Sequence, residues 1–289
     1  MKIGVLGAGA YGAALGKVLE KKGFEIVYYD PYKFPERRLT TVVKPAEILI
    51  LATPAEAVEK LLGKFTAEWL GKPLIVATKG LLKPGIYEQF SHYEIISGPG
   101  FAEEIVKGRK TMLTVACQGA ETATSEGGTG ETLAEVIFRN TNVIFDRTED
   151  VRGVRLLGAL KNVYAIEAGR RGLMPKEREF REFIETTIGE MKDVLLYNGG
   201  FVETVEKAAG RGDLMLTCGS RESRNYLFGD FLRATKNGKT GVRGGAKAFL
   251  RKTTVEGVFA AKELAREGIF IPREVEILSD VLRRIYGVK

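Results

Sequence analysis

The most constraining feature of this sequence is a glycine cluster near its beginning, at residues 7–12 (GAGAYG). The cluster follows a short apolar run at residues 2–6, which predicts a buried strand. It precedes residues 10–22, where apolar side chains recur at helical spacing. In such a strand–loop–helix unit, glycines allow a tight turn, close approach of the backbone to a pyrophosphate, and close packing of the helix on the strand. The pattern predicts a dinucleotide-binding loop built on Gly7, Gly9 and Gly12, and the alternative is a glycine-rich turn without a ligand.

Asp30 ends the second predicted strand, residues 25–29, and stands eighteen residues after Gly12. A carboxylate at this place accepts hydrogen bonds from the adenosine ribose of a dinucleotide, and its charge repels a 2′-phosphate, so NAD is favoured over NADP. Two alternatives stay open. Asp30 serves only the turn before the next proline, or a 2′-phosphate is accepted by the basic residues that follow, Lys33, Arg37 and Arg38.

The rest of the chain predicts a two-part organisation. Apolar runs at residues 48–52, 74–77, 94–96 and 112–116 predict strands, and Thr53, Pro54 and Glu56 predict a capped start for a helix over residues 55–62. Because helices alternate with strands, we expect a parallel sheet covered by helices on both faces. From about residue 146, long helical patterns replace the strands, over residues 151–168, 178–197, 222–234, 255–266 and 273–286.

The predicted fold class is therefore α/β, with an N-terminal Rossmann-like doubly wound sheet followed by an all-α C-terminal domain. We expect the dinucleotide-binding domain to cover residues 1–148 and a helical substrate-binding domain to cover residues 149–289. Residues 119–130 are rich in Gly, Thr and Glu, which is typical of a loop or a frayed helix start.

Composition excludes several classes of function. His92 is the only histidine, and Cys117 and Cys218 lie far apart, so we expect neither a metal site nor a disulfide framework. The net charge of +7 suits a nucleic-acid binder or an enzyme that attracts anionic substrates, and the dispersal of the basic residues among acidic ones favours the enzyme. The sequence lacks an apolar run of bilayer length and the regions of a signal peptide. We therefore expect a cytoplasmic protein with no membrane insertion and no nucleic-acid partner.

Lys161 is the most conspicuous polar residue of the second half, because its neighbours in the helical pattern are small or apolar. We expect such a lysine to be partly buried, and burial lowers the pKa of an amine toward the range useful for proton transfer. The alternative is a side chain that extends to the surface. Lys79 follows a predicted strand, at the edge where open α/β sheets bind ligands, and the alternative is a solvated loop lysine.

Asp213 opens an apolar stretch after a glycine-rich turn, where it serves either a site or a helix cap. Ser223, Arg224 and Asn225 form a compact polar group. The forked donors of an arginine suit a phosphate, and a solvated helix start is the alternative.

Taken together, these stretches resemble the family of NAD(P)-dependent sn-glycerol-3-phosphate dehydrogenases, which interconvert dihydroxyacetone phosphate and glycerol 3-phosphate. The resemblance spans nearly the whole chain, from GAGAYG at residues 7–12 to VEG at residues 255–257, in the family's order. The specific stretches are LKNV at residues 160–163 and GDLMLTC at residues 212–218, running on to SRN at residues 223–225. The glycine loop alone is not specific.

The resemblance implies roles for individual residues. Lys161 would donate a proton to the substrate carbonyl oxygen as hydride arrives from the nicotinamide, Asp213 would orient it, and Lys79 would contact cofactor and substrate. The substrate, a small phosphate compound, would also be bound by Gly98, Gly100, Ser223, Arg224 and Asn225. The dinucleotide would be lined by Ala10, Tyr11, Ala102, Arg224 and Glu256. The family also implies a reductive role that supplies phospholipid synthesis.

The sequence departs from the family pattern at three places. The family has Ser or Thr where Gly100 stands and an Arg-Gly pair where Thr186-Thr187 stands, and the stretch from Asp30 to Glu47 is short.

Two other functions stay open at this point. One is a different two-domain dehydrogenase, acting on a small 2-oxo or 2-hydroxy compound, against which the phosphate-binding group at residues 223–225 argues. The other is a dinucleotide-binding sensor without turnover, and a sensor needs no proton donor such as Lys161. We expect a homodimer from the frequency of that state alone.

Overall fold

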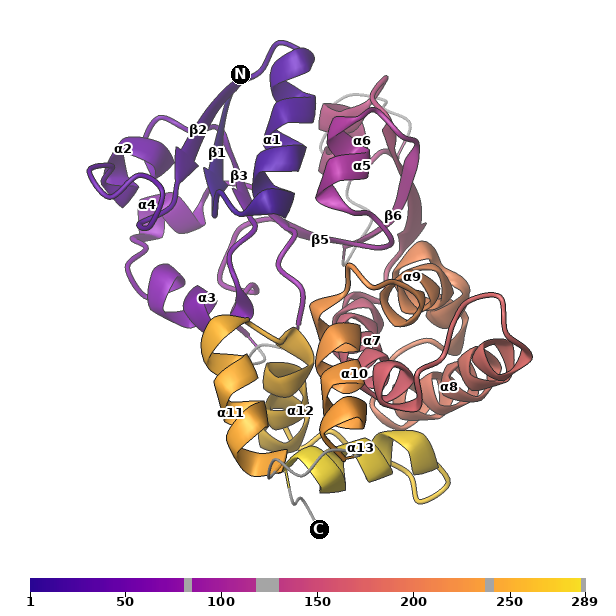
Figure 1. Ribbon diagram of the computed structural model, residues 1–289. Coiled ribbons are helices and arrows are strands. Elements are labelled where there is room, and N and C mark those ends of the chain that lie inside the picture. Colours follow the sequence, from indigo (N-terminus) through magenta and orange to yellow (C-terminus); the bar gives the residue numbers. More distant parts are fainter. Residues whose placement is uncertain (81–84, 118–129, 237–241, 287–289) are drawn as a thin grey trace. The chain divides into compact units, whose positions relative to one another are not determined.

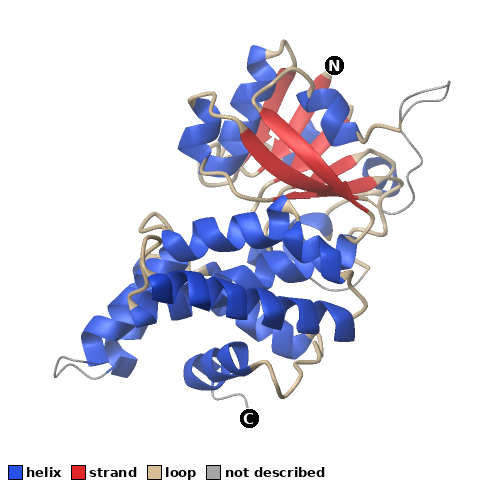
Figure 2. Ribbon diagram, turned by 90° about the vertical axis from the view of Figure 1, so that its right-hand side faces the viewer, coloured by secondary structure: helices blue, strands red, loops and turns tan. Residues whose placement is uncertain are grey.

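The computed structural model describes residues 1–80, 85–117, 130–236 and 242–286. The chain divides into two compact units, Met1–Val151 and Arg152–Lys289. Within the described ranges, every strand belongs to the first unit, and the second unit is helical (Figures 1 and 2). The predicted fold class, a Rossmann-like sheet followed by a helical region, is confirmed. No helix in these ranges has the length and apolarity that crossing a bilayer requires.

The first unit is built on a seven-stranded sheet with the order β2-β1-β3-β4-β5-β6-β7. The strands are β1 Lys2–Leu6, β2 Glu25–Tyr29, β3 Ile48–Leu51, β4 Leu74–Val76, β5 Tyr93–Ser97, β6 Thr111–Ala116 and β7 Val143–Thr148. β1 pairs in parallel with β2 on one side and β3 on the other, so the strand order reverses at β1. Open α/β sheets bind ligands outside the carboxyl ends of their strands at such a point.

The expectation of a wholly parallel sheet was wrong at one junction. β6 runs antiparallel to β5, and β7 runs parallel to β6. β7 was not predicted, because polar residues such as Asp146 and Arg147 interrupt its apolar pattern. Strand direction depends on the path of the connection, which the apolar pattern of a strand does not record.

Helices cover both faces of the sheet. They are α1 Ala10–Lys21, α2 Leu39–Val43, α3 Ala55–Leu62, α4 Ala67–Leu70, α5 Ala102–Val106 and α6 Leu133–Phe138. On one face, Ile3 and Val5 of β1 belong to a continuous core with Leu15 of α1 and with residues of α5 and α6. Alternate residues of a strand point to opposite faces of the sheet. In β3, Ile48 and Ile50 belong to this core, and Leu49 and Leu51, which alternate with them, are fully buried as well.

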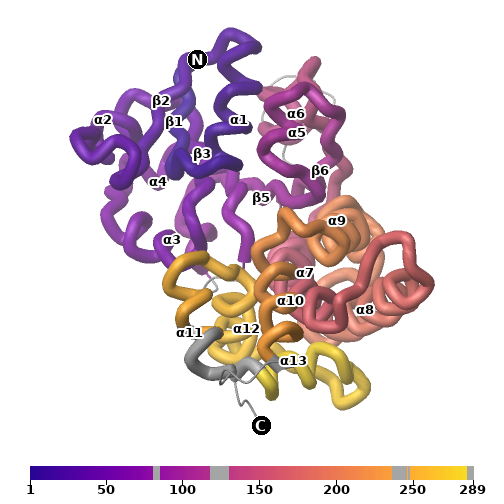
Figure 3. Tube along the Cα trace, in the orientation of Figure 1, coloured from indigo at the N-terminus to yellow at the C-terminus, as the bar shows by residue number. Residues whose placement is uncertain are grey.

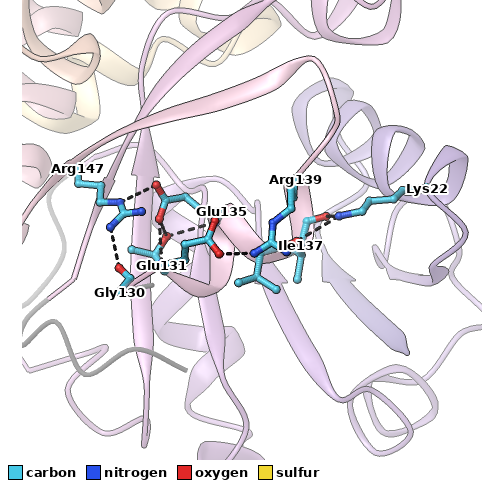
Figure 4. Close-up of polar contacts among 9 residues, drawn as sticks. Lys22, Gly130, Glu131, Glu135, Ile137, Arg139 and Arg147 are labelled. Carbon is cyan, nitrogen blue, oxygen red and sulfur yellow. Dashed lines mark hydrogen bonds and ion pairs between the residues drawn. The ribbon is translucent and has the colours of Figure 1, made fainter. Parts of the chain in front are cut away.

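α6 is held at both ends by charged side chains. The buried carboxylate of Glu94, on β5, accepts hydrogen bonds from the backbone N–H groups of Leu133 and Ala134, at 2.6 and 2.8 Å. At the other end, the ammonium of Lys22 donates to the carbonyl of Ile137 at 2.9 Å (Figure 4). Negative charge at the beginning of a helix and positive charge at its end complement the helix dipole.

The capping box also lies at α6 rather than at α3. Thr132 and Glu135 exchange reciprocal hydrogen bonds at the start of α6. At α3 the prediction was wrong, because the N-cap residue is Pro54 and it makes no side-chain cap hydrogen bond.

The helices of the second unit are α7 Val151–Arg171, which begins at the last residue of the first unit, and α8 Arg178–Tyr197, α9 Asp213–Gly219, α10 Arg224–Lys236, α11 Val242–Lys252, α12 Glu256–Arg266 and α13 Glu276–Tyr286. A 3-10 turn, η1 Val202–Glu206, and a π-helical turn, η2 Ala208–Gly212, precede α9. The five predicted helices are present; α8 has the predicted bounds, and each of the other four differs at one or both ends. α11 was not predicted, because its sequence is basic and contains two glycines, which are poor helix formers.

α10 and α12 approach α7 closely, as the trace in Figure 3 shows. At three contacts a glycine faces a backbone carbonyl so closely that a Cβ atom would overlap it. The pairs are Gly169 with Tyr226, Gly229 with Ile166, and Gly257 with Asn162.

Candidate functional site

The glycine loop joins β1 to α1, at the strand where the order of the sheet reverses. Gly7 N–H donates to the carbonyl of Tyr29 at 2.8 Å. Gly7 has a φ of +110°, and a Cβ there would lie 2.6 Å from the carbonyl oxygen of Ala52. A Cβ on Gly12 would overlap the carbonyl of Gly7. Side chains are therefore excluded at both positions.

Gly9 has a different reason to be glycine. It is the N-cap of α1, and nothing lies within 4 Å of the place where its Cβ would stand. The helix therefore begins without a side-chain cap, and the space beside Gly9 is open. A helix N-terminus of this kind favours a negatively charged group such as a pyrophosphate.

The carboxylate of Asp30 is tied to the glycine loop. Its Oδ2 accepts a hydrogen bond from Ala8 N–H at 3.0 Å, and its Oδ1 accepts from the N–H groups of Tyr32 and Lys33 at 3.0 and 3.1 Å. The carboxylate therefore orders the turn, and it also stands beside the glycine loop, as the predicted ribose contact requires.

The basic residues after Asp30 differ in how they are engaged. The guanidinium of Arg37 donates to the carbonyl of Tyr28 at 3.0 Å and lies 4.7 Å from the ring centroid of Phe34. Lys33 and Arg38 are exposed.

Lys79 lies three residues beyond β4, at the carboxyl edge of the sheet. Its Nζ donates to the carbonyl of Gly98 at 3.4 Å and lies 5.4 Å from the ring centroid of Tyr11, in the first turn of α1. The loop after β4 is fixed by Thr78, whose hydroxyl donates to the carbonyl of Thr53 at 2.9 Å. The structure thus brings Lys79, Tyr11 and Gly98 together beside the glycine loop.

Gly98 and Gly100 follow β5, and Ala102 begins α5 immediately after them. A Cβ on Gly98 would lie 3.0 Å from the Cα of Leu113. At Gly100, a Cβ would lie 2.9 Å from the Cγ2 methyl of Thr111. The Thr111 methyl therefore occupies the space that a larger residue at position 100 would need.

Thr186 and Thr187 keep their hydroxyls within α8. Thr186 donates to the carbonyl of Glu182 at 2.9 Å, and the buried Thr187 donates to the carbonyl of Phe183 at 3.0 Å.

Lys161 and Asp213 form a buried ion pair in the second unit. Lys161 Nζ contacts Asp213 Oδ2, and the two side chains are 2% and 1% exposed. The expected burial of Lys161 is confirmed and is more complete than the sequence indicated. Asp213 is the first residue of α9, directly after the π-helical turn. Such turns occur frequently at functional sites.

Two further residues surround this pair. The hydroxyl of Thr217 donates to the carbonyl of Asp213 at 2.6 Å and lies 3.4 Å from its Oδ1. Burial raises the pKa of the Cys218 thiol, although the charge of Lys161 opposes the shift. Cys218 is therefore a neutral packing residue. Thr217 belongs to the GDLMLTC stretch and had no predicted role, and its position one helical turn after Asp213 is the signal for it.

Asn225 lies in a buried network of amides. Its Nδ2 donates to Asn162 Oδ1 at 2.8 Å, and its Oδ1 accepts from Gly257 N–H at 2.8 Å. Asn162 in turn donates to the carbonyl of Gly158 at 3.0 Å. These bonds link α7, α10 and α12. Asn162 had no predicted role, and it directly follows Lys161.

Arg224 and Glu256 lie at the exposed border of this network. Arg224 Nη2 lies 3.4 Å from Glu256 Oε1, and the side chains are 52% and 38% exposed. Ser223 is buried, and its hydroxyl accepts from Tyr226 N–H at 3.3 Å at the start of α10.

The predicted residues therefore form two groups, one in each unit. The first comprises the glycine loop with Ala10 and Tyr11, and Asp30, Lys79, Gly98, Gly100 and Ala102. The second comprises Lys161, Asp213, Ser223, Arg224, Asn225 and Glu256.

Comparison with known proteins gives consistent matches. The family model described as the NAD-dependent glycerol-3-phosphate dehydrogenase C-terminus matches residues 150–288, and the model of the N-terminus matches residues 34–123. A glycerol-3-phosphate dehydrogenase (NAD(P)+) of Roseobacter denitrificans is 32% identical, over 92% of this chain and 88% of that protein. The corresponding protein of Rhizobium etli is also 32% identical, over 92% of this chain and 87% of its own.

Solved structures share the fold. The glycerol-3-phosphate dehydrogenase of Coxiella burnetii superposes with a TM-score of 0.78 at 21% identity, covering 99% of this chain and 94% of that one. The enzyme of Saccharomyces cerevisiae gives 0.75 at 18% identity, covering 100% of this chain and 96% of that one.

Proposed function

The chain belongs to the NAD-dependent glycerol-3-phosphate dehydrogenase family, and we propose that it transfers a hydride between NAD(P)H and dihydroxyacetone phosphate to give sn-glycerol 3-phosphate, reversibly. The observation that carries the proposal is the buried ion pair of Lys161 and Asp213. A reduced carbonyl needs a proton at its oxygen, and a lysine held in apolar surroundings is suited to supply one.

The chemistry that bound NAD(P)H supplies is a hydride for carbon 2 of the substrate. The electrons of the carbonyl double bond pass to the oxygen, and that oxygen takes a proton from Lys161 Nζ. Asp213 contacts the Lys161 ammonium and orients it beforehand. Lys161 then regains its proton from water, and in the oxidative direction it accepts the proton of the alcohol.

The residues of the first unit fit a dinucleotide. Gly9 leaves open space before the N-terminus of α1, where a pyrophosphate is favoured. Asp30, held beside the loop through Ala8, is placed to accept hydrogen bonds from the ribose. We assign Gly7, Gly9, Ala10, Tyr11, Gly12, Asp30, Lys79 and Ala102 of this unit to cofactor binding, together with Arg224 and Glu256 of the second.

We infer that NAD is the preferred cofactor and that NADP is accepted less well. The carboxylate of Asp30 repels a 2′-phosphate, and Arg37 already holds the carbonyl of Tyr28. The measurement is the ratio of kcat/KM for NADH and NADPH. A preference for NADPH would overturn this part of the proposal.

For the substrate phosphate we assign Arg224, supported by a guanidinium that is half exposed and whose contact with Glu256 is long, at 3.4 Å. Lys79, Gly98, Gly100 and Ser223 complete the proposed substrate contacts. Asn225 has its amide engaged with Asn162 and Gly257, so we assign it to holding this region in place.

The proposal extends to the whole chain. Residues 1–148 form the dinucleotide-binding domain, and residues 149–289 carry the proton donor and the phosphate-binding arginine.

We infer a homodimer, supported by exposed apolar side chains around the end of α8. We also infer a cytoplasmic location, supported by Cys117 and Cys218, which are both unpaired thiols.

The decisive experiment mixes the purified protein with NADH and dihydroxyacetone phosphate and follows the loss of NADH absorbance. We expect turnover with this substrate and little with unphosphorylated dihydroxyacetone or with pyruvate. Turnover of pyruvate but not of the phosphate would point to a different dehydrogenase. NADH binding without turnover of any of the three would point to a sensor.

A further inference from the structure

The exposed turn that follows Asp30 is held by several hydrogen bonds to that residue. The carbonyl of Asp30 accepts a hydrogen bond from Phe34 N–H at 2.8 Å. The Oδ1 atom of the same residue accepts from the N–H groups of Tyr32 and Lys33. Three N–H groups within five residues are thus fixed by a single aspartate.

The far side of the turn is anchored by aromatic packing. The ring of Phe34 stacks on that of Tyr28, with centroids 6.4 Å apart and planes inclined by 30°. The guanidinium of Arg37 covers the ring of Phe34 at 4.7 Å and donates to the carbonyl of Tyr28. The turn therefore rests on the last residues of β2.

Tyr32 projects from this ordered turn into solvent. Its side chain is 95% exposed, more than any other large apolar side chain among the described residues, where Leu196 follows at 61%. Its backbone is fixed by Asp30, whose other oxygen holds Ala8 of the glycine loop. The hydrogen-bonded turn thus presents the exposed ring of Tyr32 two residues after Asp30, which is itself bonded to the glycine loop.

We propose that the Tyr32 ring is the surface on which the adenine of the dinucleotide stacks. The inference rests on the proposed function, since it needs a dinucleotide whose ribose lies at Asp30. The base is attached to that ribose, so a ribose held at Asp30 would bring the adenine close to the turn that carries Tyr32. Adenine offers a flat π-face, and stacking on an aromatic ring needs no hydrogen-bond partner, which matches the exposed ring of Tyr32.

The proposal assigns Tyr32 to affinity rather than to chemistry. Adenine is bound equally in the ground state and in the transition state, so loss of the stacking surface raises KM for NADH and leaves kcat unchanged. The effect must also be confined to ligands that contain adenine.

The test measures direct binding of ligands to the wild-type protein and to three variants. For Tyr32→Ala we expect the Kd of NADH and of ADP-ribose to rise about tenfold, the range typical of one aromatic–base stack. The Kd of reduced nicotinamide mononucleotide, which lacks adenine, stays unchanged. Tyr32→Phe keeps the ring and stays within about twofold of wild type. Met112→Ala removes an exposed apolar side chain elsewhere in the first unit and serves as the control.

The outcomes separate this inference from the proposed function. Unchanged NADH affinity in Tyr32→Ala, with NADH bound normally by the wild type, overturns the stacking role alone. An equal loss of affinity for the mononucleotide also overturns it, because it reveals a disturbed loop. Failure of the wild-type protein to bind NADH at all refutes the proposed function and the inference with it.

Discussion

Burying Lys161 and Asp213 removes two charges from water, and each side chain compensates the other. Removing one partner of a buried pair leaves an unpaired charge and destabilises a protein by about 3–5 kcal/mol. Replacing both by neutral groups of similar size is often neutral. The contribution of this pair to stability and its proposed role in proton transfer can therefore be tested separately, with single and double variants.

Lys161→Ala is expected to lower kcat by about 10²–10⁴-fold, the usual share of a positioned proton donor, while the Kd of NADH stays within about twofold. The double variant Lys161→Met/Asp213→Asn has no charge at either position. It should regain most of the stability lost in Lys161→Ala, as measured by urea unfolding, without regaining turnover. Substantial turnover in the double variant would remove Lys161 from the mechanism.

Arg224 and Asn225 are neighbours in sequence with opposite expected effects. Asn225→Ala leaves the N–H of Gly257 unpaired in a buried place and should lower the free energy of unfolding by about 1–3 kcal/mol. Arg224→Ala should leave stability unchanged and weaken substrate binding by about 2 kcal/mol, seen as a higher KM for dihydroxyacetone phosphate. An equal loss of stability in both variants would contradict this division.

The local sequence around Lys161 was enough to predict its burial, because the small and apolar residues beside it share its helix. The partners of Asn225 were not predictable in this way. Its amide meets Asn162, which is 63 residues away, and only the packing of α10 on α7 joins them. Residue types thus revealed the buried lysine, whereas the supporting network depends on tertiary structure.

At the scale of elements, two buried glutamates of the second unit differ in their hydrogen-bond partners and in the direction of their pKa shifts. Glu190, on α8, accepts hydrogen bonds from Ile277 and Leu278 at the start of α13, at 2.7 and 3.1 Å, and from the hydroxyl of Tyr164 at 2.9 Å. Burial raises the pKa of Glu190 above its ordinary value of 4.5 in spite of these bonds.

Glu167, on α7, is paired with two arginines. Arg170 donates to it twice at 2.6 Å and Arg171 once at 2.7 Å. Burial raises the pKa of Glu167, but the hydrogen bonds from the arginines outweigh burial, and the net pKa is lowered below 4.5.

The two glutamates should therefore respond to pH with opposite signs. A raised pKa contributes stability that is complete below pH 4.5 and is lost as the pH rises through the folded-state pKa. The stability of wild type relative to Glu190→Gln should thus fall from pH 4 to pH 8. A lowered pKa contributes stability that is present above pH 4.5 and is lost as the pH falls, so the stability relative to Glu167→Gln should rise from about pH 3 to 6.

Urea unfolding of both variants and of wild type across this pH range measures the two differences. Each variant is the control for the other, since both replace a buried glutamate of the second unit by its amide. Slopes of the same sign would contradict the assigned environments.

Strand and helix positions followed from apolar periodicity wherever an element carried enough apolar residues. The direction of β6, the polar strand β7 and the basic helix α11 did not, because chain path and tertiary contacts decide them. The role of Glu94 was equally hidden, since its hydrogen-bond partners lie 39 and 40 residues further along the chain.

At the scale of the whole molecule, exposed apolar side chains gather around the end of α8. Tyr197 and Phe270 have ring centroids 5.3 Å apart, and Asn198 bonds to both backbone polar groups of Phe270, at 2.8 and 2.9 Å. We call Leu196, Tyr197, Phe201 and Phe270 the α8 patch; each is at least 50% exposed. Exposed apolar side chains that gather in one place mark sites of association.

Sedimentation velocity should therefore find a dimer that depends on the α8 patch. Phe270→Asp places a charge in the patch, and we expect it to shift the protein to a monomer at micromolar concentration. Met112→Asp, at an apolar residue that is 46% exposed in the first unit, is the control and should remain a dimer. A dimer in both variants would locate the contact elsewhere.

The glycine contacts of α10 and α12 with α7 also limit how this chain can be altered by laboratory evolution. At Gly169, Gly229 and Gly257, even an alanine requires one helix to move away from another, and those helices carry Lys161 and the amide network beside it. Random mutagenesis at these three positions will therefore yield almost only unstable or inactive variants. A library designed to change the substrate range should leave all three unaltered and sample the exposed border around Arg224, where new side chains meet solvent rather than backbone.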